Sequence, residues 1–293
     1  MILVAGGSGL LGSRLATDLC ARGHAVRVLS RGLTPLSRPL PDQVEVVHGD
    51  VRDRASISRA MAGVDQVVSA VQGFAGPGGG TPATVDLGGN LNLIAEAEAR
   101  GASFVLISVL GAAADSPMEL FRAKYAAEQR LRAATCPWTI IRPDASAETW
   151  VGLMDQTAGS AHRPLVFGRG DNPIAWVSVD DVVALTVRVV TDDSLRGRTL
   201  EICGPQQATL RELASMVMAQ RGWPGHPRRI PRPVLHLMAA VTSLVRPQLA
   251  RQARASLAMD SLPTARDDAL RAEFPDLPRI PVSDIVARTV SIA

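Results

Sequence analysis

The stretch MILVAGGSGLLGSRL (Met1 to Leu15) decides the fold of this chain. A short apolar run is followed by four glycines within seven positions, and then by apolar residues at helical spacing. A strand, a glycine-rich turn and a helix in this order suit a pyrophosphate, because glycine lets the backbone approach closely and unpaired amides at a helix start attract negative charge. The sequence therefore predicts a dinucleotide site at Gly6, Ser8, Gly9, Leu10, Leu11 and Gly12; the alternative is a tight turn without a ligand.

The first half of the chain alternates short apolar runs with amphipathic segments. The runs ILVA, FVLIS and WTIIRP are separated by helical patterns, among them Leu10 to Arg22, Leu87 to Arg100 and Glu119 to Ala133. Uniformly apolar strands between amphipathic helices are typical of a parallel sheet covered on both faces. We therefore expect an α/β fold with a doubly wound, Rossmann-type parallel sheet.

This rhythm changes after Pro143, where short strands and helices mix. We predict a dinucleotide-binding core over residues 1–145 and a smaller α/β substrate lobe over residues 146–293, closely packed against it. Within the lobe, Thr209 and Glu212 have the spacing of a capping box. Ser178 and Asp181 have the same spacing, and for them we favour capping over a role in a site.

Composition excludes several classes of protein. The 293 residues carry 31 basic and 28 acidic side chains, a balance that does not indicate a nucleic-acid partner. Three scattered cysteines and five histidines lack metal or triad spacing, so no metal site is predicted. The first strand starts at Met1, which favours the cytoplasm over export. The stretch PVLHLMAAVTSLV (Pro233 to Val245) is too short to span a bilayer and indicates a buried or partner-facing helix.

The end of the second strand indicates which cofactor is bound. The segment VRVLSRG contains no carboxylate to accept from a ribose 2′-hydroxyl, whereas Arg31, with Ser30, could bind a 2′-phosphate. NADP(H) is therefore favoured and NAD(H) remains the alternative, since Arg31 could also be a solvated side chain at a strand end.

Two later strand ends supply further candidate cofactor contacts. Asp50 could accept from the adenine amino group beside the Val51 backbone, or it could instead cap the turn that follows. Ser69, Ala70 and Val71 would lie beside a cofactor ribose, as small residues where the chain approaches closely.

Six segments together resemble the atypical short-chain dehydrogenases, most closely the NmrA-like, NAD(P)H-binding branch: GGSGLLG, GDVRD, VDLGGNLNLIAEA, RAKYAAEQRLR, PWTIIRP and VSVDDVVAL. The likeness runs from Met1 to about Leu213 and implies a nicotinamide cofactor with a substrate cleft formed by the C-terminal lobe. It also implies that Ser108 orients the substrate and that Lys124 contacts the nicotinamide ribose and takes part in catalysis. Separately, Pro143 at the end of the sixth strand could close over the nicotinamide. Alternatively, Lys124 is a surface lysine paired with Glu128, and Pro143 merely ends a strand.

One position departs from that pattern. The resemblance implies a tyrosine four residues before Lys124, but Leu120 stands there and cannot exchange a proton. Tyr125, the only tyrosine, lies about 100° around the helix from Lys124. Loss of a general acid typically costs a factor of about 10² to 10⁴ in rate.

We therefore expect an NADP(H)-dependent oxidoreductase that lacks the usual catalytic tyrosine and reduces a small carbonyl, enone, imine or quinone. The alternative is a non-catalytic NAD(P)H-binding redox sensor or accessory protein. In the tail, Val245, Leu249, Ala253 and Leu257 share a helical face that could pack on the protein's own core, a membrane surface or a second subunit, so a homodimer stays open.

Overall fold

The computed structural model describes residues 1–33, 36–74 and 78–292. The chain forms two compact units. The first comprises Met1–Asp115, Leu120–Arg142 and Val182–Glu201, and the second comprises Ser116–Glu119, Pro143–Asp181 and Ile202–Ala293. The assignment of substrate binding to the C-terminal part of the chain remains a prediction.

A seven-stranded sheet in the order β3-β2-β1-β4-β5-β6-β9 forms the centre of the first unit. Its strands are β1 (Ile2–Ala5), β2 (Val26–Ser30), β3 (Glu45–His48), β4 (Gln66–Ser69), β5 (Ser103–Ile107), β6 (Trp138–Pro143) and β9 (Thr199–Ile202). All pairs from β3 to β6 are parallel. The order from β3 to β6 is that of the Rossmann fold, so the predicted fold class is confirmed.

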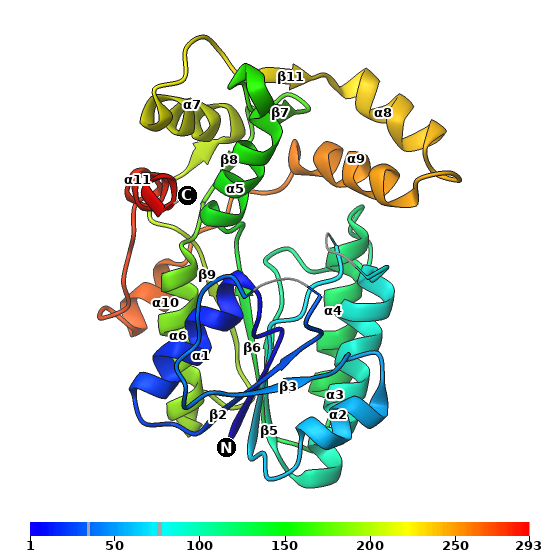
Figure 1. The fold of residues 1–293 in the computed structure, drawn as a ribbon, viewed down its shortest axis with the longest axis vertical. Coiled ribbons are helices and arrows are strands. Elements are labelled where there is room, and N and C mark those ends of the chain that lie inside the picture. Colours follow the sequence, from blue (N-terminus) through cyan, green and yellow to red (C-terminus); the bar gives the residue numbers. More distant parts are fainter. Residues whose placement is uncertain (34–35, 75–77, 293) are drawn as a thin grey trace. The chain divides into compact units, whose positions relative to one another are not determined.

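Helices cover both faces of this sheet, with α1 and α6 on one side and α2, α3 and α4 on the other (Figure 1). The bounds are α1 (Leu10–Ala21), α2 (Arg54–Ala60), the π-helix η1 (Pro82–Gly89), α3 (Asn90–Arg100), α4 (Glu119–Arg132), α6 (Val179–Thr191) and the 3₁₀ turn η3 (Asp193–Leu195). The central strands are buried on both faces, which explains their continuous apolar sequences. Phe104 and Leu106 pack with Leu93 and Leu131 in the core on the α2–α4 side.

The second unit has its own core, in which Trp176 is fully buried among Val151, Leu213 and Val286. Its elements are α5 (Ala147–Ala158), η2 (Gly159–Ala161), β7 (Leu165–Phe167), β8 (Pro173–Ile174), β10 (Ala208–Thr209), α7 (Leu210–Arg221), β11 (Arg228–Ile230), α8 (Arg232–Val241), α9 (Pro247–Met259), α10 (Asp268–Glu273) and α11 (Val282–Ile292). β8 pairs with β10 antiparallel, and β7 pairs with β11 in parallel.

The capping predictions for the second unit have different outcomes. Thr209 and Glu212 form the predicted capping box at the start of α7. Ser178 accepts a hydrogen bond from the amide of Asp180, as a capping residue would. The predicted pairing of Ser178 with Asp181 is wrong. Instead, Glu148 accepts hydrogen bonds from the Ser178 hydroxyl and the Val179 amide. Asp181 instead accepts from Arg271 and from the Ile280 amide. A carboxylate from α5 therefore replaces the local one at this helix start.

The predicted apolar stripe of the tail is wrong in part. α9 begins only at Pro247, and its buried residues are the alanines 250, 253, 255 and 258. Val245 lies before the helix and is exposed. Small residues form the packed face because α8 lies directly against α9.

Candidate functional site

The glycine turn between β1 and α1 leaves no room for side chains. Gly6 has φ +83°, and a Cβ atom there would lie 2.8 Å from the Ala70 carbonyl oxygen. A Cβ at Gly12 would lie 2.4 Å from the Gly6 oxygen, and one at Gly7 would lie 2.4 Å from a methyl carbon of Val28. The turn therefore holds α1 close to the ends of β1 and β4.

The first turn of α1 presents backbone donors. Gly9 is the N-cap residue, no side chain caps the helix, and the first turn carries no acidic residue. The first intrahelical hydrogen bond runs from the Ser13 amide to the Gly9 oxygen at 2.9 Å, so the amides of Leu10, Leu11 and Gly12 precede it. This cradle fits the pyrophosphate of a dinucleotide in shape and in charge.

Ser8 lies in the same turn and is half-buried. Its carbonyl oxygen accepts hydrogen bonds from the Ser37 amide at 3.1 Å and from the Ser37 hydroxyl at 3.0 Å. These bonds fix the segment after β2 against the glycine turn.

The end of β3 carries an ion pair that the sequence analysis did not anticipate. The Asp50 carboxylate accepts from Arg52 Nη2 at 2.6 Å, from Nε at 3.0 Å and from the Arg52 amide at 2.9 Å. The hydrogen bonds from Arg52, helped by the nearby charge of Arg31, lower the pKa of Asp50. Asp50 thus organises the following turn, which was one of its two predicted roles; adenine binding stays a prediction. The neighbouring Val51 is buried against Gly89.

Arg31 and Arg52 converge on one backbone position. Arg52 Nη2 donates to the Gly78 oxygen at 3.3 Å, and Arg31 Nη1 lies 2.9 Å from where a Gly78 Cβ would be. The Ser30 hydroxyl is turned to its own strand end, where it accepts from the Gly32 amide at 3.2 Å. Two guanidinium groups, rather than Arg31 alone, therefore gather beyond β2 and β3. The GDVRD motif, with a second arginine after the acid, was the signal for this.

Lys124 is buried on α4, where it has two hydrogen-bond acceptors and one counter-ion. Its Nζ donates to the Val71 oxygen at 2.9 Å and to the Ile107 oxygen at 3.0 Å, and it lies 3.1 Å from Asp86 Oδ1. The alternative of a surface lysine paired with Glu128 is therefore wrong. The ammonium joins the carboxyl ends of β4 and β5 to η1.

Asp86, the counter-ion of Lys124, is fully buried. Its Oδ2 accepts from the Gly73 amide at 2.8 Å. Burial raises the pKa of Asp86, and the Lys124 charge and the Gly73 amide oppose that shift. The sequence analysis missed Asp86, although an acid between Val85 and Leu87 in an apolar run is an unusual placement for a solvated residue.

Ser69 takes part in a second buried network. Its hydroxyl donates to Asn90 Oδ1 at 2.6 Å. Asn90 Nδ2 in turn donates to the backbone carbonyl oxygen of Asp86 at 2.6 Å. The Ser69 hydroxyl donor and the Val71 carbonyl are thus already engaged, and the contacts of Ser69, Ala70 and Val71 with a cofactor stay a prediction. Asn90 stands where η1 passes into α3, and π-helical turns are frequent at functional sites.

Ser108 follows β5 and is buried. Its hydroxyl donates to Glu128 Oε1 at 2.5 Å. Glu128 also accepts from Arg142 Nη2 at 2.6 Å and from Arg132 Nη1 at 3.2 Å, and it is fully buried. Ser108 is thus held by a carboxylate that two arginines neutralise, and its predicted role toward a substrate is untested.

The position that lacks a tyrosine is filled by packing. Leu120 is buried near the start of α4, and Tyr125, on the same helix, is half-buried. Pro143 is the last residue of β6, so it does end the strand, and its predicted contact with nicotinamide stays a prediction.

Two searches over the described residues gave no site of another kind. Within those parts of the chain, no group of three or more His, Cys, Asp or Glu side chains could hold a metal ion. Across the same ranges, no helix is both long and apolar enough to cross a membrane.

Comparisons with known proteins agree with this geometry. The profile of the NAD(P)H-binding family matches residues 6–193. An NAD(P)H azoreductase from Xenophilus azovorans is 25% identical over 228 residues, which cover 76% of this chain and 75% of that protein. Photosystem II assembly factor Ycf39 from Synechocystis is 27% identical over 248 residues, covering 82% and 74%. The structure of NADPH-dependent quinone oxidoreductase QOR2 from Escherichia coli, complexed with NADPH, matches with a TM-score of 0.73 at 20% identity, covering 100% of this chain and 99% of that chain.

Proposed function

This chain belongs to the NAD(P)H-binding family, and from that premise we propose that it is an NADP(H)-dependent oxidoreductase. The observation that carries the proposal is the glycine cradle. The amides of Leu10, Leu11 and Gly12 precede the first intrahelical bond of α1, and no side chain caps them. Such a helix start binds the pyrophosphate of a dinucleotide.

Arg31 and Arg52 support a preference for NADP(H). Both guanidinium groups lie near Gly78, and Asp50 is already neutralised by Arg52. A 2′-phosphate would bring two negative charges to these arginines, whereas a 2′-hydroxyl would need an acceptor. Asp50, the carboxylate that follows β3, is engaged with Arg52.

Bound NADPH would supply a hydride, and the protein would have to supply the proton. Leu120 cannot do so, and Lys124 already donates to two carbonyl oxygens and forms an ion pair with Asp86. Lys124 would therefore have to leave some of these contacts before donating to a ribose or a substrate. Its main role in this proposal is to fix the ends of β4 and β5, while solvent provides the proton.

A weak proton supply favours substrates whose hydride adduct is a stabilised anion. Reduction of a quinone gives a phenolate-type product with a pKa near ~10, whereas a simple ketone gives an alkoxide whose pKa is close to the ~15.7 of water. The phenolate-type product can therefore dissociate from the protein without first being protonated by a general acid. We therefore propose quinones, and enones that form delocalised enolates, as the substrate class.

The test is titration of the purified protein with NADPH and NADH by fluorescence, followed by NADPH consumption with quinones, enones and matched unconjugated ketones. We expect tighter binding of NADPH and turnover of quinones well above that of ketones. Equal rates for both classes would contradict the proton argument, and absence of nucleotide binding would contradict the whole proposal.

A second function is favoured by one comparison and by Leu120. The similarity to an assembly factor, together with the missing tyrosine, fits a protein that binds NAD(P)H without turnover and signals its occupancy to a partner. Tight nucleotide binding with no consumption across the whole substrate panel would select this alternative.

A further inference from the structure

We propose that the outer face of α8 and the turn after it form a docking surface for an anionic lipid bilayer. We refer to Val234, Leu237, Val241, Leu244 and Val245 as the α8 patch. This inference is independent of the proposed function, because it concerns a surface of the second unit only.

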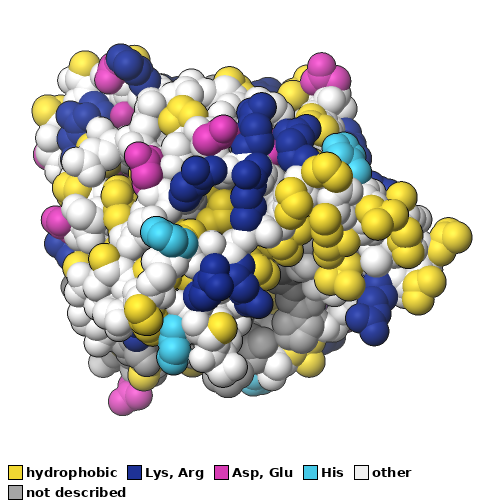
Figure 2. Space-filling view, turned by 90° about the horizontal axis from the view of Figure 1, so that it is seen from above, with side chains coloured by type: hydrophobic (Ala, Val, Ile, Leu, Met, Phe, Trp, Pro, Cys, Tyr) yellow, Lys and Arg dark blue, Asp and Glu magenta, His cyan; other side chains and the backbone are white. Residues whose placement is uncertain are grey.

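The α8 patch gathers most of the exposed large apolar side chains of the described residues. Its five members are 43%, 63%, 66%, 93% and 81% exposed. In the described ranges, only four other large apolar side chains are exposed: Leu33, Leu36, Val46 and Leu91. Figure 2 shows hydrophobic side chains forming a continuous patch at one end of this face, with basic side chains along its edge. An isolated exposed leucine is ordinary, but a contiguous patch marks an interaction site.

α8 is apolar on both of its faces. Leu235 and Ala239 are buried and pack against Ala253 of α9. Val234, Leu237 and Val241 recur at spacings of three and four on the opposite face, which is exposed. The core contact therefore explains only the inner face. A helix that is hydrophobic all round is expected to be covered on every side.

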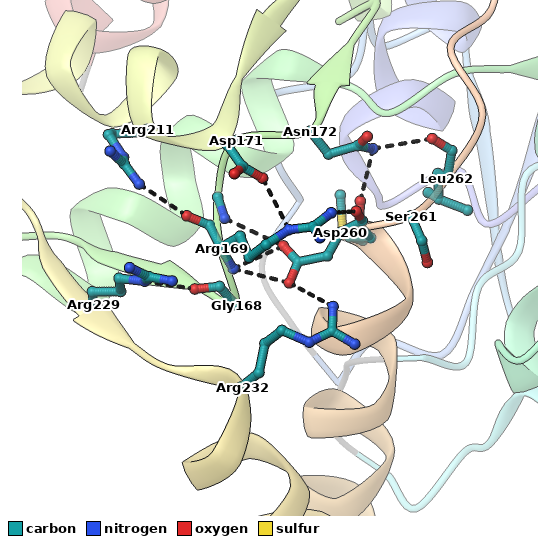
Figure 3. A network of polar contacts seen from close by, with 12 residues as sticks. Gly168, Arg169, Asp171, Asn172, Arg211, Arg229, Arg232, Asp260, Ser261 and Leu262 are labelled. Carbon is teal, nitrogen blue, oxygen red and sulfur yellow. Dashed lines mark hydrogen bonds and ion pairs between the residues drawn. The ribbon is translucent and has the colours of Figure 1, made fainter.

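The α8 patch is also held in place by polar contacts at its base (Figure 3). Asp260, which ends α9 and is buried, accepts from the amides of Arg169 and Gly170 and from Arg232 Nη1 at 3.1 Å. Arg232 begins α8, so one carboxylate ties the start of α8, the end of α9 and the turn after β7 together. The exposed face thus belongs to an ordered helix pair and not to a loose tail.

Charge selects the occupant. Residues 213–259 contain seven arginines and two histidines but no aspartate or glutamate, in a chain with 28 acidic residues. Arg221, Arg232 and Arg251 pair with carboxylates, whereas Arg246, which directly follows the patch, and Arg254 on α9 are exposed. In a symmetric dimer the same surface meets itself, so these cations would face cations. An anionic bilayer instead offers apolar depth for the patch and phosphate charge for its arginines.

Vesicle flotation of the full chain tests the proposal. We expect the protein to float with phosphatidylcholine vesicles that contain roughly one third phosphatidylglycerol, and not with pure phosphatidylcholine. Added salt should weaken the binding, because the attraction of the arginines is screened. Equal flotation with neutral and anionic vesicles, or none with either, would overturn the proposal.

Matched variants separate the two contributions. Leu237→Ser with Leu244→Ser should lower the vesicle partition coefficient about a hundredfold or more, on the order of what burial of two leucines contributes. Val46→Ser in the first unit should leave it unchanged. Arg246→Gln and Arg254→Gln should each lower it about fivefold, with Arg22→Gln as the control. These positions are exposed, so melting temperatures should equal that of the parent protein.

Self-association is the competing outcome. Light scattering coupled to size exclusion, without lipid, measures the mass of the protein in solution. A dimer that Leu244→Ser dissociates, in a protein that does not float with anionic vesicles, would assign the α8 patch to a second copy of this chain and overturn the lipid proposal.

Discussion

Replacing Asp86 by asparagine tests the most heavily buried ion pair in the first unit. The side chains of Lys124 and Asp86 are 5% and 0% exposed, and their charged atoms lie 3.1 Å apart. Asp86→Asn keeps the size of the side chain and an oxygen that can still accept from the Gly73 amide. It removes the negative charge and puts an NH₂ donor where Oδ1 faced Lys124, so Lys124 becomes a buried cation without a counter-ion.

The magnitude follows from two opposing terms. Breaking a buried pair by removing one partner typically costs about 3–5 kcal/mol. Burial already raises the pKa of Asp86, which means that the aspartate itself pays a desolvation cost that asparagine does not. Because that desolvation cost offsets much of what the pair contributes, we expect a loss below that range, about 1–2 kcal/mol in the free energy of unfolding at neutral pH.

The pH dependence of the loss distinguishes charge from packing. Without Asp86, the buried charge of Lys124 has no counter-ion and is disfavoured in the folded state, so the unfolded state binds more protons at alkaline pH. The stability of Asp86→Asn should then rise, relative to the parent protein, as the pH is raised from neutral toward ~10. A simple packing defect would give the same loss at every pH.

Urea unfolding followed by circular dichroism measures both quantities. Asp18→Asn is the control, because its pair with Arg22 is exposed and should contribute ~0.5 kcal/mol or less. Adding Lys124→Met to Asp86→Asn should recover most of the loss, since an apolar side chain needs no counter-ion. A loss below ~1 kcal/mol for Asp86→Asn, or one that does not change with pH, would refute the reasoning.

Three further predictions concern other parts of the chain. Arg31→Ala and Arg52→Ala should each raise the Kd for NADPH about tenfold or more while leaving NADH binding nearly unchanged, measured by fluorescence titration; parallel losses for both nucleotides would exclude a 2′-phosphate contact. Gly12→Ala places a Cβ 2.4 Å from the Gly6 oxygen and should cost about 1–3 kcal/mol and abolish nucleotide binding, so unaltered binding by calorimetry would remove the cradle from the site. Burial raises the pKa of Asp144 from 3.8 to about 6, so the folded state binds an extra proton between these values. Because of this group, the free energy of unfolding of the parent protein falls as the pH rises from about 4 to about 6. Above pH 6, Asp144→Asn should therefore exceed the parent protein in free energy of unfolding by about 1–2 kcal/mol, after discounting for its partial exposure, and at pH 4 the two should be equal.

The fold could be predicted because it depends on local patterns. Apolar strands of four to six residues, separated by helices of ordinary length, admit few arrangements other than a parallel sheet covered on both sides. The glycines of the first turn were informative for the same reason, since Gly6 and Gly12 are required by contacts within the turn and with the neighbouring strand end. The helix holding Lys124 was placed to within one residue, at Glu119–Arg132.

The partners of the site residues could not be predicted because they come from distant segments. Asp86 meets Lys124 across 38 residues of sequence, and Ser108 meets Glu128 across 20. Local rules propose the nearest opposite charge, which for Lys124 is Glu128 at i+4. That rule describes solvated helix faces. On a buried face each charge needs its own desolvated partner, and the sequence does not say which strand or turn provides it.

The separation of these two charges limits what α4 can do in catalysis. Lys124 is neutralised by Asp86 from η1, whereas Glu128 is neutralised by Arg142 from β6. Each pair thus ties the same helix to a different neighbour, and neither charge is left over to assist a reacting oxygen. Leu120 lies one turn before Lys124 on α4 and is buried. The face of α4 on which a proton donor would lie therefore packs against the sheet instead. If the proposed function is right, a substrate reduced here would have to tolerate an unprotonated product, which is why a quinone tests the site more sharply than a ketone does.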